Sequence, residues 1–279
     1  KYIKVGNMDF KTYIETFSDE NEKPLDRMVT DGGMCSIFRT IGCIGDSLSS
    51  GEFESYSPDG VTGYHDMYEY SWGQFIARAA GCTVRNFSRG GMTAKEYLDS
   101  FGNTHGLFSV DIKCQAYIIA LGVNEMYRFG LEKFGTLDDA LNGAHAYGDD
   151  FTIAGTYGEI IRRYRAIQPR AVFFLMTCPY EPHLPAATQE YQDRHAQLLR
   201  DLADRLDNTY VIDLRKYAPV YDATLRKKFY LGGHMNPMGY RFTADMVMSY
   251  IDYIVRSNME DFAQVGFIGK GVHNYNAKW

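Results

Sequence analysis

The sequence predicts a three-layer α/β/α sandwich built around a five-stranded, mainly parallel sheet. Short apolar runs alternate with helical patterns along most of the chain, which is typical of strands joined by crossover helices. The runs are continuously apolar, as expected of parallel strands covered by helices on both faces. In open sheets of this kind ligands bind at the carboxyl ends of the strands. Those positions therefore carry the functional interpretation.

The first predicted strand and the first predicted helix follow a polar N-terminal stretch. Residues 35–44 form an apolar run that ends at Gly45, which predicts a buried strand. Residues 66–80 carry aromatic and aliphatic side chains at helical spacing. Gly81 follows them, and glycine is a common helix end because it tolerates the left-handed conformation.

The middle of the chain repeats this alternation. Residues 82–87 predict a short strand. Thr93 is followed three residues later by Glu96, the spacing of a capping box at the start of a helix. The run 116–121 is continuously apolar and ends at a glycine, which predicts another buried strand. The remaining predicted elements are a helix at about 150–167, a strand at 171–177, a helix at 186–206, a strand at 210–214 and a helix at 238–256.

The composition is that of an ordinary folded protein. The chain has 279 residues, of which 45% are hydrophobic and 23% charged, and this suits one large domain. We expect residues 1–33 to be a peripheral N-terminal extension and residues 34–279 to be the functional domain. A formal net charge of −6 argues against nucleic acid as a partner. No apolar stretch approaches the roughly 20 residues of a membrane span.

The cysteines and most of the histidines indicate no special chemistry. The five cysteines are scattered without a CxxC pair, which favours reduced thiols in a cytoplasmic protein. A secreted location stays open if a signal peptide preceded Lys1. His183 and His195 lack partners at metal-ligand spacing and are expected at the surface. No feature of the sequence defines an oligomeric state.

Small or polar residues stand where predicted strands end and where the last helix begins. Because the carboxyl ends of parallel strands meet at one edge of a sheet, we expect these segments to converge. The segments are Gly45-Asp46-Ser47-Leu48, Asn86 to Thr93, Gly122-Val123-Asn124, and Gly232-Gly233-His234-Met235-Asn236-Pro237.

These residue types suit acyl transfer, which needs a nucleophile, a base and donors for the oxyanion. Ser47 is the candidate nucleophile, and its backbone N–H lies at a helix N-terminus, where the helix dipole favours negative charge. Gly91 has no Cβ and can bring a bare N–H close to a ligand. The Asn124 amide can donate a third hydrogen bond. His234 can accept the Ser47 proton and return it to the leaving alcohol.

Together the four segments resemble the signature blocks of the SGNH, or GDSL-type, hydrolase superfamily. The blocks are matched at Ser47, Gly91, Asn124 and His234, in the order of the superfamily over about residues 36–256. The resemblance implies a flavodoxin-like sheet and hydrolysis of esters by Ser47 and His234. It implies an oxyanion hole formed by Ser47, Gly91 and Asn124, and it implies no metal and no organic cofactor.

One position departs from the pattern of the superfamily. The family usually carries Asp three residues before the histidine, and here that position is Leu231, which cannot accept the imidazole N–H. A backbone carbonyl can orient His234 in a Ser-His dyad, or another carboxylate such as Asp222 or Asp213 can reach the ring. The third explanation is a weak or inactive member. Retention of all four motif residues favours the first two explanations.

A short acyl group, acetyl above all, on a carbohydrate is the expected substrate. The chain has no long apolar lid, and it contains 22 tyrosines. Tyrosine combines a stacking face with a polar tip, which suits a carbohydrate. Rings that cap a core edge are an equally good interpretation of the aromatic cluster formed by Tyr56, Tyr64, Tyr68, Tyr70 and Trp72.

Two other classes of protein match the sequence less well. An α/β-hydrolase has G-x-S-x-G at its nucleophile after several strands, whereas here Gly45-Asp46-Ser47-Leu48-Ser49 follows the first core strand. The non-enzymatic alternative is a catalytically weak or inactive flavodoxin-like module that binds a small molecule. The hydroxyl-rich stretch from Gly45 to Gly51 suits a phosphate, but this interpretation leaves Gly91, Asn124 and His234 unexplained.

Overall fold

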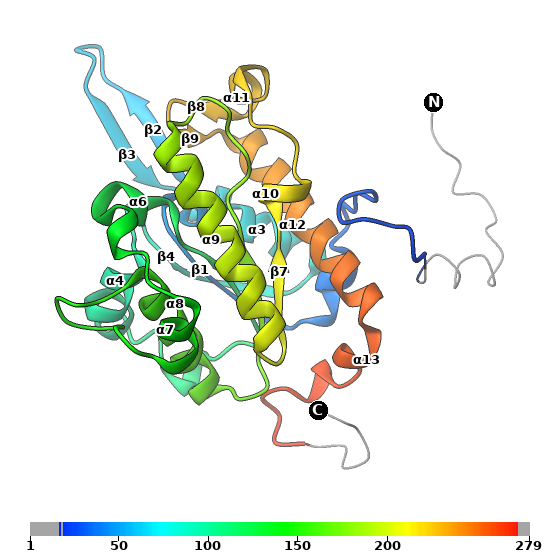
Figure 1. Ribbon diagram of the computed structural model, residues 1–279. Coiled ribbons are helices and arrows are strands. Elements are labelled where there is room, and N and C mark those ends of the chain that lie inside the picture. The colour runs from blue at the N-terminus through cyan, green and yellow to red at the C-terminus, as the bar shows by residue number, and fades with distance from the viewer. Residues whose placement is uncertain (1–16, 18, 273–279) are drawn as a thin grey trace, which may run out of the picture.

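The computed structural model describes residue 17 and residues 19–272. At its centre is a five-stranded sheet in the order β4-β1-β5-β6-β7, in which all neighbouring strands are parallel. Helices cover both faces, so the predicted three-layer sandwich is confirmed (Figure 1). The strands of this sheet are β1 (Thr40–Gly45), β4 (Thr83–Ser88), β5 (Ala116–Ala120), β6 (Val172–Met176) and β7 (Thr209–Ile212).

The strand order creates a switch point between β1 and β5. The chain passes from β1 to β4 on one side and then returns to β5 on the other side of β1. Connections that leave in opposite directions open a crevice at the carboxyl ends of the two strands. Ser47 follows β1 and Asn124 follows β5. The topology therefore brings these residues to the same crevice.

The two faces of the sheet carry separate cores. Along β5, Ala116 and Ile118 belong to one core, whereas Tyr117 and Ile119 belong to the other, because successive side chains of a strand point to opposite faces. Side chains of α3 and α12 fill the first core, and side chains of α8 and α9 fill the second. No helix within the described residues has the length and apolar character needed to cross a lipid bilayer.

The helices occupy most of the connections between strands. The α-helices are α2 (Ser47–Ser50), α3 (Trp72–Ala80), α4 (Ala94–Glu96), α5 (Gly102–Thr104), α6 (Val123–Phe129), α7 (Leu137–Asn142), α8 (Ile153–Ile167), α9 (Ala186–Arg205), α10 (Leu214–Tyr217), α11 (Ala223–Phe229), α12 (Pro237–Ser257) and α13 (Met259–Phe262). A single-turn π-helix, η3 (Tyr97–Phe101), joins α4 to α5, and the 3-10 helices are η1 (Gly33–Ile37), η2 (Tyr68–Tyr70), η4 (Val110–Ile112), η5 (Leu131–Lys133) and η6 (Val265–Phe267).

The segment between β1 and α3 differs from its prediction. The helix predicted at 66–80 begins only at Trp72, with the Ser71 side chain as its cap. Before it, β2 (Glu52–Tyr56) and β3 (Thr62–Asp66) pair as an antiparallel hairpin that projects from the body of the protein (Figure 1). Tyr68 and Tyr70 gave the helix-like spacing, but they lie in the short 3-10 helix η2, and Asp66 pairs with Glu52 across the hairpin.

The start of the sheet also lies later than predicted. The apolar run 35–44 contains the end of η1, and β1 begins only at Thr40. Within the predicted extension, the backbone N–H of Val29 donates to Ser249 Oγ (2.9 Å), and Glu22 pairs with Arg256 (2.7 Å), which attaches this stretch to α12. Residues 1–16 and 18 of the extension lie outside the described residues.

A short strand pair and the start of α12 hold His234. The pair is β8 (Tyr230–Leu231) and β9 (His234–Met235). Immediately afterwards the Asn236 side chain accepts the N–H of Gly239 (2.9 Å), and Pro237 occupies the first turn of the helix. Both features favour a helix start at this point. His234 therefore lies three residues before the first residue of a helix that is firmly packed in the core.

Candidate active site

The turn that carries Ser47 is fixed by its neighbours. β1 ends at Gly45, and a Cβ there would lie 2.2 Å from Ser49 Oγ, so the turn has room only for glycine. The Asp46 carboxylate caps α2 by accepting the backbone N–H of Leu48 (3.0 Å). Burial raises the pKa of Asp46 to about 7. The Ser47 side chain is partly exposed at this turn.

The predicted oxyanion donors converge on this turn. The Asn124 side-chain amide donates to the backbone oxygen of Met92 (3.1 Å) and, at longer range, to Asp46 (3.4 Å), which links the ends of β1, β4 and β5. Gly91 has a φ of 68°, a conformation that favours glycine. The backbone N–H groups of Ser47 and Gly91 have no acceptor within the described part of the chain. Both therefore remain available to a ligand.

The Nδ1 atom of His234 is held by a carboxylate that the sequence did not indicate. Glu54 of β2 lies with Oε1 2.8 Å from Nδ1. The same oxygen accepts the N–H of Gly233 (2.7 Å), and Oε2 accepts the hydroxyl of Tyr56 (2.7 Å). Burial by itself raises the pKa of Glu54, but the hydrogen bonds from Tyr56, His234 and Gly233 together lower it below its usual value.

Glu54 corrects the sequence-based expectation for this ring. Of the two favoured explanations, a backbone carbonyl at His234 is wrong, and another carboxylate that reaches the ring is what the structure has. The two named carboxylates are wrong as well, because Asp222 caps α11 through the N–H of Leu225 (2.8 Å) and Asp213 pairs with Arg200 (2.8 Å). The carboxylate has moved from the position of Leu231 to a strand about 180 residues earlier in the chain.

One protein-family model matches most of the chain. Residues 43–242 match the family model of the GDSL-like lipase/acylhydrolase family. The chain belongs to this family. Membership makes the protein a hydrolase of ester bonds, as the superfamily resemblance implied. Among curated proteins, none matches the sequence of this hydrolase.

Solved structures share the fold of this GDSL-type hydrolase at low sequence identity. One is a family two carbohydrate esterase from Clostridium thermocellum in complex with cellohexaose. It is 15% identical with a TM-score of 0.54, and the match covers 86% of this chain and 66% of the esterase chain. Another is a carbohydrate esterase family 2 enzyme from Corynascus thermopiles (Myceliophthora fergusii) with a carbohydrate-binding domain. It is 16% identical with a TM-score of 0.52, and the match covers 82% of this chain and 67% of the enzyme chain. A Lactobacillus plantarum protein is 16% identical with a TM-score of 0.52, and covers 77% and 97%.

A second carboxylate of the hairpin contacts the other nitrogen of His234. Glu52 Oε1 lies 3.0 Å from Nε2, and a Cβ on Gly90 would lie 2.1 Å from Glu52 Oε2. Burial, with the nearby Asp66 and Glu54 carboxylates, raises the pKa of Glu52 against the lowering effect of His234. No hydrogen bond joins Ser47 Oγ to His234 among the described residues. In this hydrolase Glu52 therefore occupies the side of the ring that would face a nucleophile.

The hairpin adds an aromatic ring beside the base. Tyr64 of β3 lies opposite Glu54 in the hairpin register, and its ring centroid is 5.7 Å from that of His234, at an angle of 73°. The Tyr64 side chain is 60% exposed, and Tyr56 is 55% exposed. By contrast, Trp72 from the same predicted cluster is fully buried in the core. Only part of the aromatic cluster is therefore available to a ligand.

A buried layer supports the Gly122-Val123-Asn124 segment. Glu125 Oε1 accepts the N–H of Ala94 (2.7 Å), which ties the start of α6 to the loop after Gly91, and burial raises the pKa of Glu125 to about 7. A Cβ on Gly122 would lie 2.6 Å from the His195 ring. His195 is 1% exposed, so its predicted surface position is wrong, and burial lowers its pKa to about 4. His183 is exposed as predicted.

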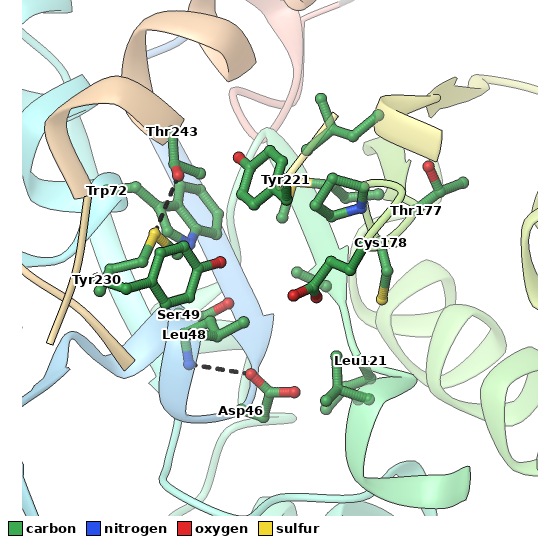
Figure 2. A pocket seen from close by; sticks show the side chains of 17 residues that line it. Asp46, Leu48, Ser49, Trp72, Leu121, Thr177, Cys178, Tyr221, Tyr230 and Thr243 are labelled. Atoms are coloured by element: carbon green, nitrogen blue, oxygen red, sulfur yellow. Dashed lines mark hydrogen bonds between the residues drawn. The ribbon is translucent and has the colours of Figure 1, made fainter. Parts of the chain in front are cut away.

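A small cavity lies beside the Ser47 turn. Its volume is about 60 Å³, and its lining is mainly apolar, with Leu48 and Tyr230 on one side and Leu121 and Cys178 on the other (Figure 2). The carboxylate of Asp46 points into it (Figure 2). This apolar surrounding explains why burial raises the pKa of Asp46 so strongly. The five cysteines are free thiols, and no group of three candidate metal ligands occurs in the described residues.

Proposed function

We propose that this hydrolase is a serine esterase that removes a short acyl group, acetyl above all, from a carbohydrate. Ser47 is the nucleophile, His234 the general base and then the general acid, and Glu54 the carboxylate that orients His234 and stabilises its charged form. The backbone N–H groups of Ser47 and Gly91 and the Asn124 amide hold the oxyanion. The observation that carries the proposal is the pairing of His234 with Glu54 (2.8 Å).

Each step follows from the position of one group. His234 Nε2 takes the Ser47 proton as Oγ attacks the ester carbonyl, and the negative charge develops on the carbonyl oxygen. The backbone N–H groups of Ser47 and Gly91 have no acceptor among the described residues, and fixed donors of this kind are effective in a site from which water is excluded. The protonated ring then donates to the leaving alcohol. In the second half of the reaction, His234 takes a proton from a water molecule as that water attacks the acyl carbonyl. The ring then returns the proton to Ser47 Oγ, and the acid leaves.

Two observations support a carbohydrate. The solved structures that share the fold include two carbohydrate esterases. The exposed rings of Tyr64 and Tyr56 stand on the hairpin beside His234, and aromatic faces suit the apolar face of a sugar ring. The small cavity beside the Ser47 turn has a mainly apolar lining, which suits the acyl group of an ester.

The alternative is a catalytically weak or inactive module that binds a small molecule. One observation favours it: Glu52 lies 3.0 Å from His234 Nε2, so the nucleophile and the base are not in hydrogen-bond contact. For the esterase to work, the Glu52 carboxylate has to make room at Nε2 when the substrate binds.

Replacement of the nucleophile distinguishes the two functions. With p-nitrophenyl acetate and an acetylated xylo-oligosaccharide, we expect Ser47→Ala to lower kcat by at least about 10⁴-fold, because the acyl-enzyme cannot form. Ser257→Ala, at the exposed far end of α12, is the matched control and should keep the wild-type rate. A fluorophosphonate should label Ser47, as detected by peptide mass spectrometry. Equal hydrolysis by wild type and Ser47→Ala would eliminate the proposed nucleophile.

A further inference from the structure

Glu52 stands between the proposed base and the loop that carries Gly91. One of its oxygens is 3.0 Å from His234 Nε2, and the other lies against the α-carbon of Gly90, where a Cβ would come within 2.1 Å of it. The Glu52 side chain is 12% exposed. A leaving alcohol that receives a proton from Nε2 must therefore lie close to this carboxylate.

The backbone of Glu52 is anchored, so its side chain starts from a fixed position beside His234. Its carbonyl oxygen accepts the hydroxyl of Tyr240 (2.6 Å), a residue that is fully buried in α12. On the other side of β2, the Phe53 ring packs on Tyr240 and Tyr70, at centroid distances of 5.6 and 5.7 Å. The pleat of the strand then directs Glu52 and Glu54 together toward His234.

The ring of His234 donates to Glu52 from Nε2 only while the imidazole is protonated. Within the described residues the ion pair of Glu52 is with His234, while the arginines near Gly91, Arg89 and Arg128, both pair with Glu96. The proposed reaction moves the proton from Ser47 Oγ to Nε2 and then from Nε2 to the leaving oxygen. After that transfer the imidazole is neutral and no longer balances Glu52. A carboxylate that is largely removed from water and has no donor is costly.

A substrate hydroxyl can supply the missing donor. On a sugar ring, a hydroxyl next to the ester-bearing carbon lies within hydrogen-bond distance of the leaving oxygen. When that oxygen approaches Nε2, the neighbouring hydroxyl reaches the oxygen of Glu52 that lies beside the same nitrogen. The exposed Tyr64 ring next to His234 offers a face for the sugar. No proton moves to or from Glu52 in this arrangement.

We propose that Glu52 is a specificity-determining residue that accepts a hydrogen bond from a free hydroxyl next to the scissile ester. This proposal rests on the proposed esterase function. The preferred substrates are then monoacylated vicinal diols, such as a sugar with one acetylated and one free neighbouring hydroxyl. Esters in which the neighbouring oxygen is alkylated or acylated are poor substrates.

Two small esters that differ in one donor test the proposal. 2-Hydroxyethyl acetate carries the neighbouring hydroxyl, and 2-methoxyethyl acetate replaces it by an ether. We expect the wild type to favour the hydroxyl compound by about tenfold or more in kcat/KM, the effect of a hydrogen bond to a charged group. In Glu52→Ala the ratio should fall to about 1, and in Glu52→Gln, which keeps a neutral acceptor, it should lie between. Any effect of the substitution on His234 changes kcat/KM for both esters alike. It therefore cancels in the ratio of the two values within each variant.

The controls separate the two proposals. Glu69→Ala removes an exposed carboxylate just after the hairpin and should keep the wild-type ratio. Hydrolysis of p-nitrophenyl acetate that requires Ser47, together with a wild-type ratio near 1, would overturn the role of Glu52 while the esterase stands. An unchanged ratio in Glu52→Ala would overturn it equally. So would a preference for acetylcholine over 2-hydroxyethyl acetate, since Glu52 would then select a cation. Absence of Ser47-dependent hydrolysis would refute the esterase itself.

Discussion

Ser47, Gly91 and Asn124 follow three neighbouring strands of one sheet, whereas His234 and Glu54 meet across 180 residues of sequence. The first three residues, the oxyanion side, depend on strand order, because parallel strands deliver their carboxyl ends to one edge. His234, Glu54 and Glu52, the base side, depend on how a projecting hairpin packs against β8 and β9. The oxyanion side is thus fixed by the core, and the base side by the packing of a projecting hairpin.

The largest effect that we expect in a test of this comparison is on the base side. In Glu54→Ala, His234 loses the acceptor at Nδ1, so its tautomer and orientation are no longer fixed and its charged form is less stable. Loss of the corresponding carboxylate in other serine hydrolases costs up to about 10⁴ in turnover, and we expect kcat for p-nitrophenyl acetate to fall by about 10²–10⁴-fold. The free energy of unfolding, measured with urea, checks that the variant folds.

Glu69→Ala serves as the control for Glu54→Ala, because its carboxylate is exposed next to the hairpin. Glu54→Gln keeps the size of the side chain but not its charge, and should retain little more activity than Glu54→Ala. A folded Glu54→Ala enzyme with kcat within twofold of wild type would show that Glu54 is only a structural partner of His234.

The oxyanion side should give a somewhat smaller effect of a different kind. In Asn124→Ala the site loses one donor, which typically costs about 10²–10³ in kcat. Because this donor acts on charge that develops in the transition state, KM should change little. Steady-state kinetics with p-nitrophenyl acetate separate the two parameters. A raised KM with unchanged kcat would instead assign Asn124 to ground-state binding.

The positions of Ser47 and Asn124 at one edge of the sheet could be predicted from sequence because each is tied to a local signal, while their catalytic roles stay predictions. Ser47 and Asn124 each follow an apolar run that ends at a glycine, and Gly45 and Gly122 are required at those ends by the close approach of Ser49 and His195. The fold follows from the same runs, since buried parallel strands are continuously apolar. Membership of the GDSL-like lipase/acylhydrolase family agrees with the predicted superfamily.

Glu54 was missed because its contact with His234, 180 residues later in the chain, is not local. A signal was present: Ser57-Pro58-Asp59-Gly60 has the composition of a turn, and residues with strand propensity stand on both sides. Even so, the sequence does not reveal that the hairpin reaches His234, because that contact depends on the packing of Phe53 against α12. His195 was misplaced for a related reason, since its burial depends on how closely Gly122 approaches α9.

The contributions of the two sides to the free energy of unfolding should also change with pH in opposite directions. Glu54 on the base side has a lowered pKa because its hydrogen bonds from Tyr56, His234 and Gly233 outweigh burial. A carboxyl whose pKa is lowered in the folded state adds stability above its usual pKa and loses it as the pH falls through the folded value. Glu125, which supports the oxyanion side, has a pKa raised by burial to about 7. Between its usual value of 4.5 and about 7 the folded state holds the extra proton, so stability falls as the pH rises.

Unfolding with urea from pH 3.5 to 8 therefore distinguishes Glu54→Gln from Glu125→Gln. Relative to wild type, Glu125→Gln should gain up to about 3 kcal/mol as the pH rises through the interval from 4.5 to 7, because it removes the cost of ionising a buried group. Relative to wild type, Glu54→Gln should be destabilised at neutral pH, and this deficit should shrink only in acid. Asp46, with a pKa raised to about 7, and His195, with a pKa lowered to about 4, also titrate here, but they remain in both proteins of each comparison. If the free energy of unfolding of both variants varies with pH as that of the wild type does, the predicted contrast between Glu54 and Glu125 is wrong. Each carboxylate would then have the same pKa in the folded and the unfolded chain.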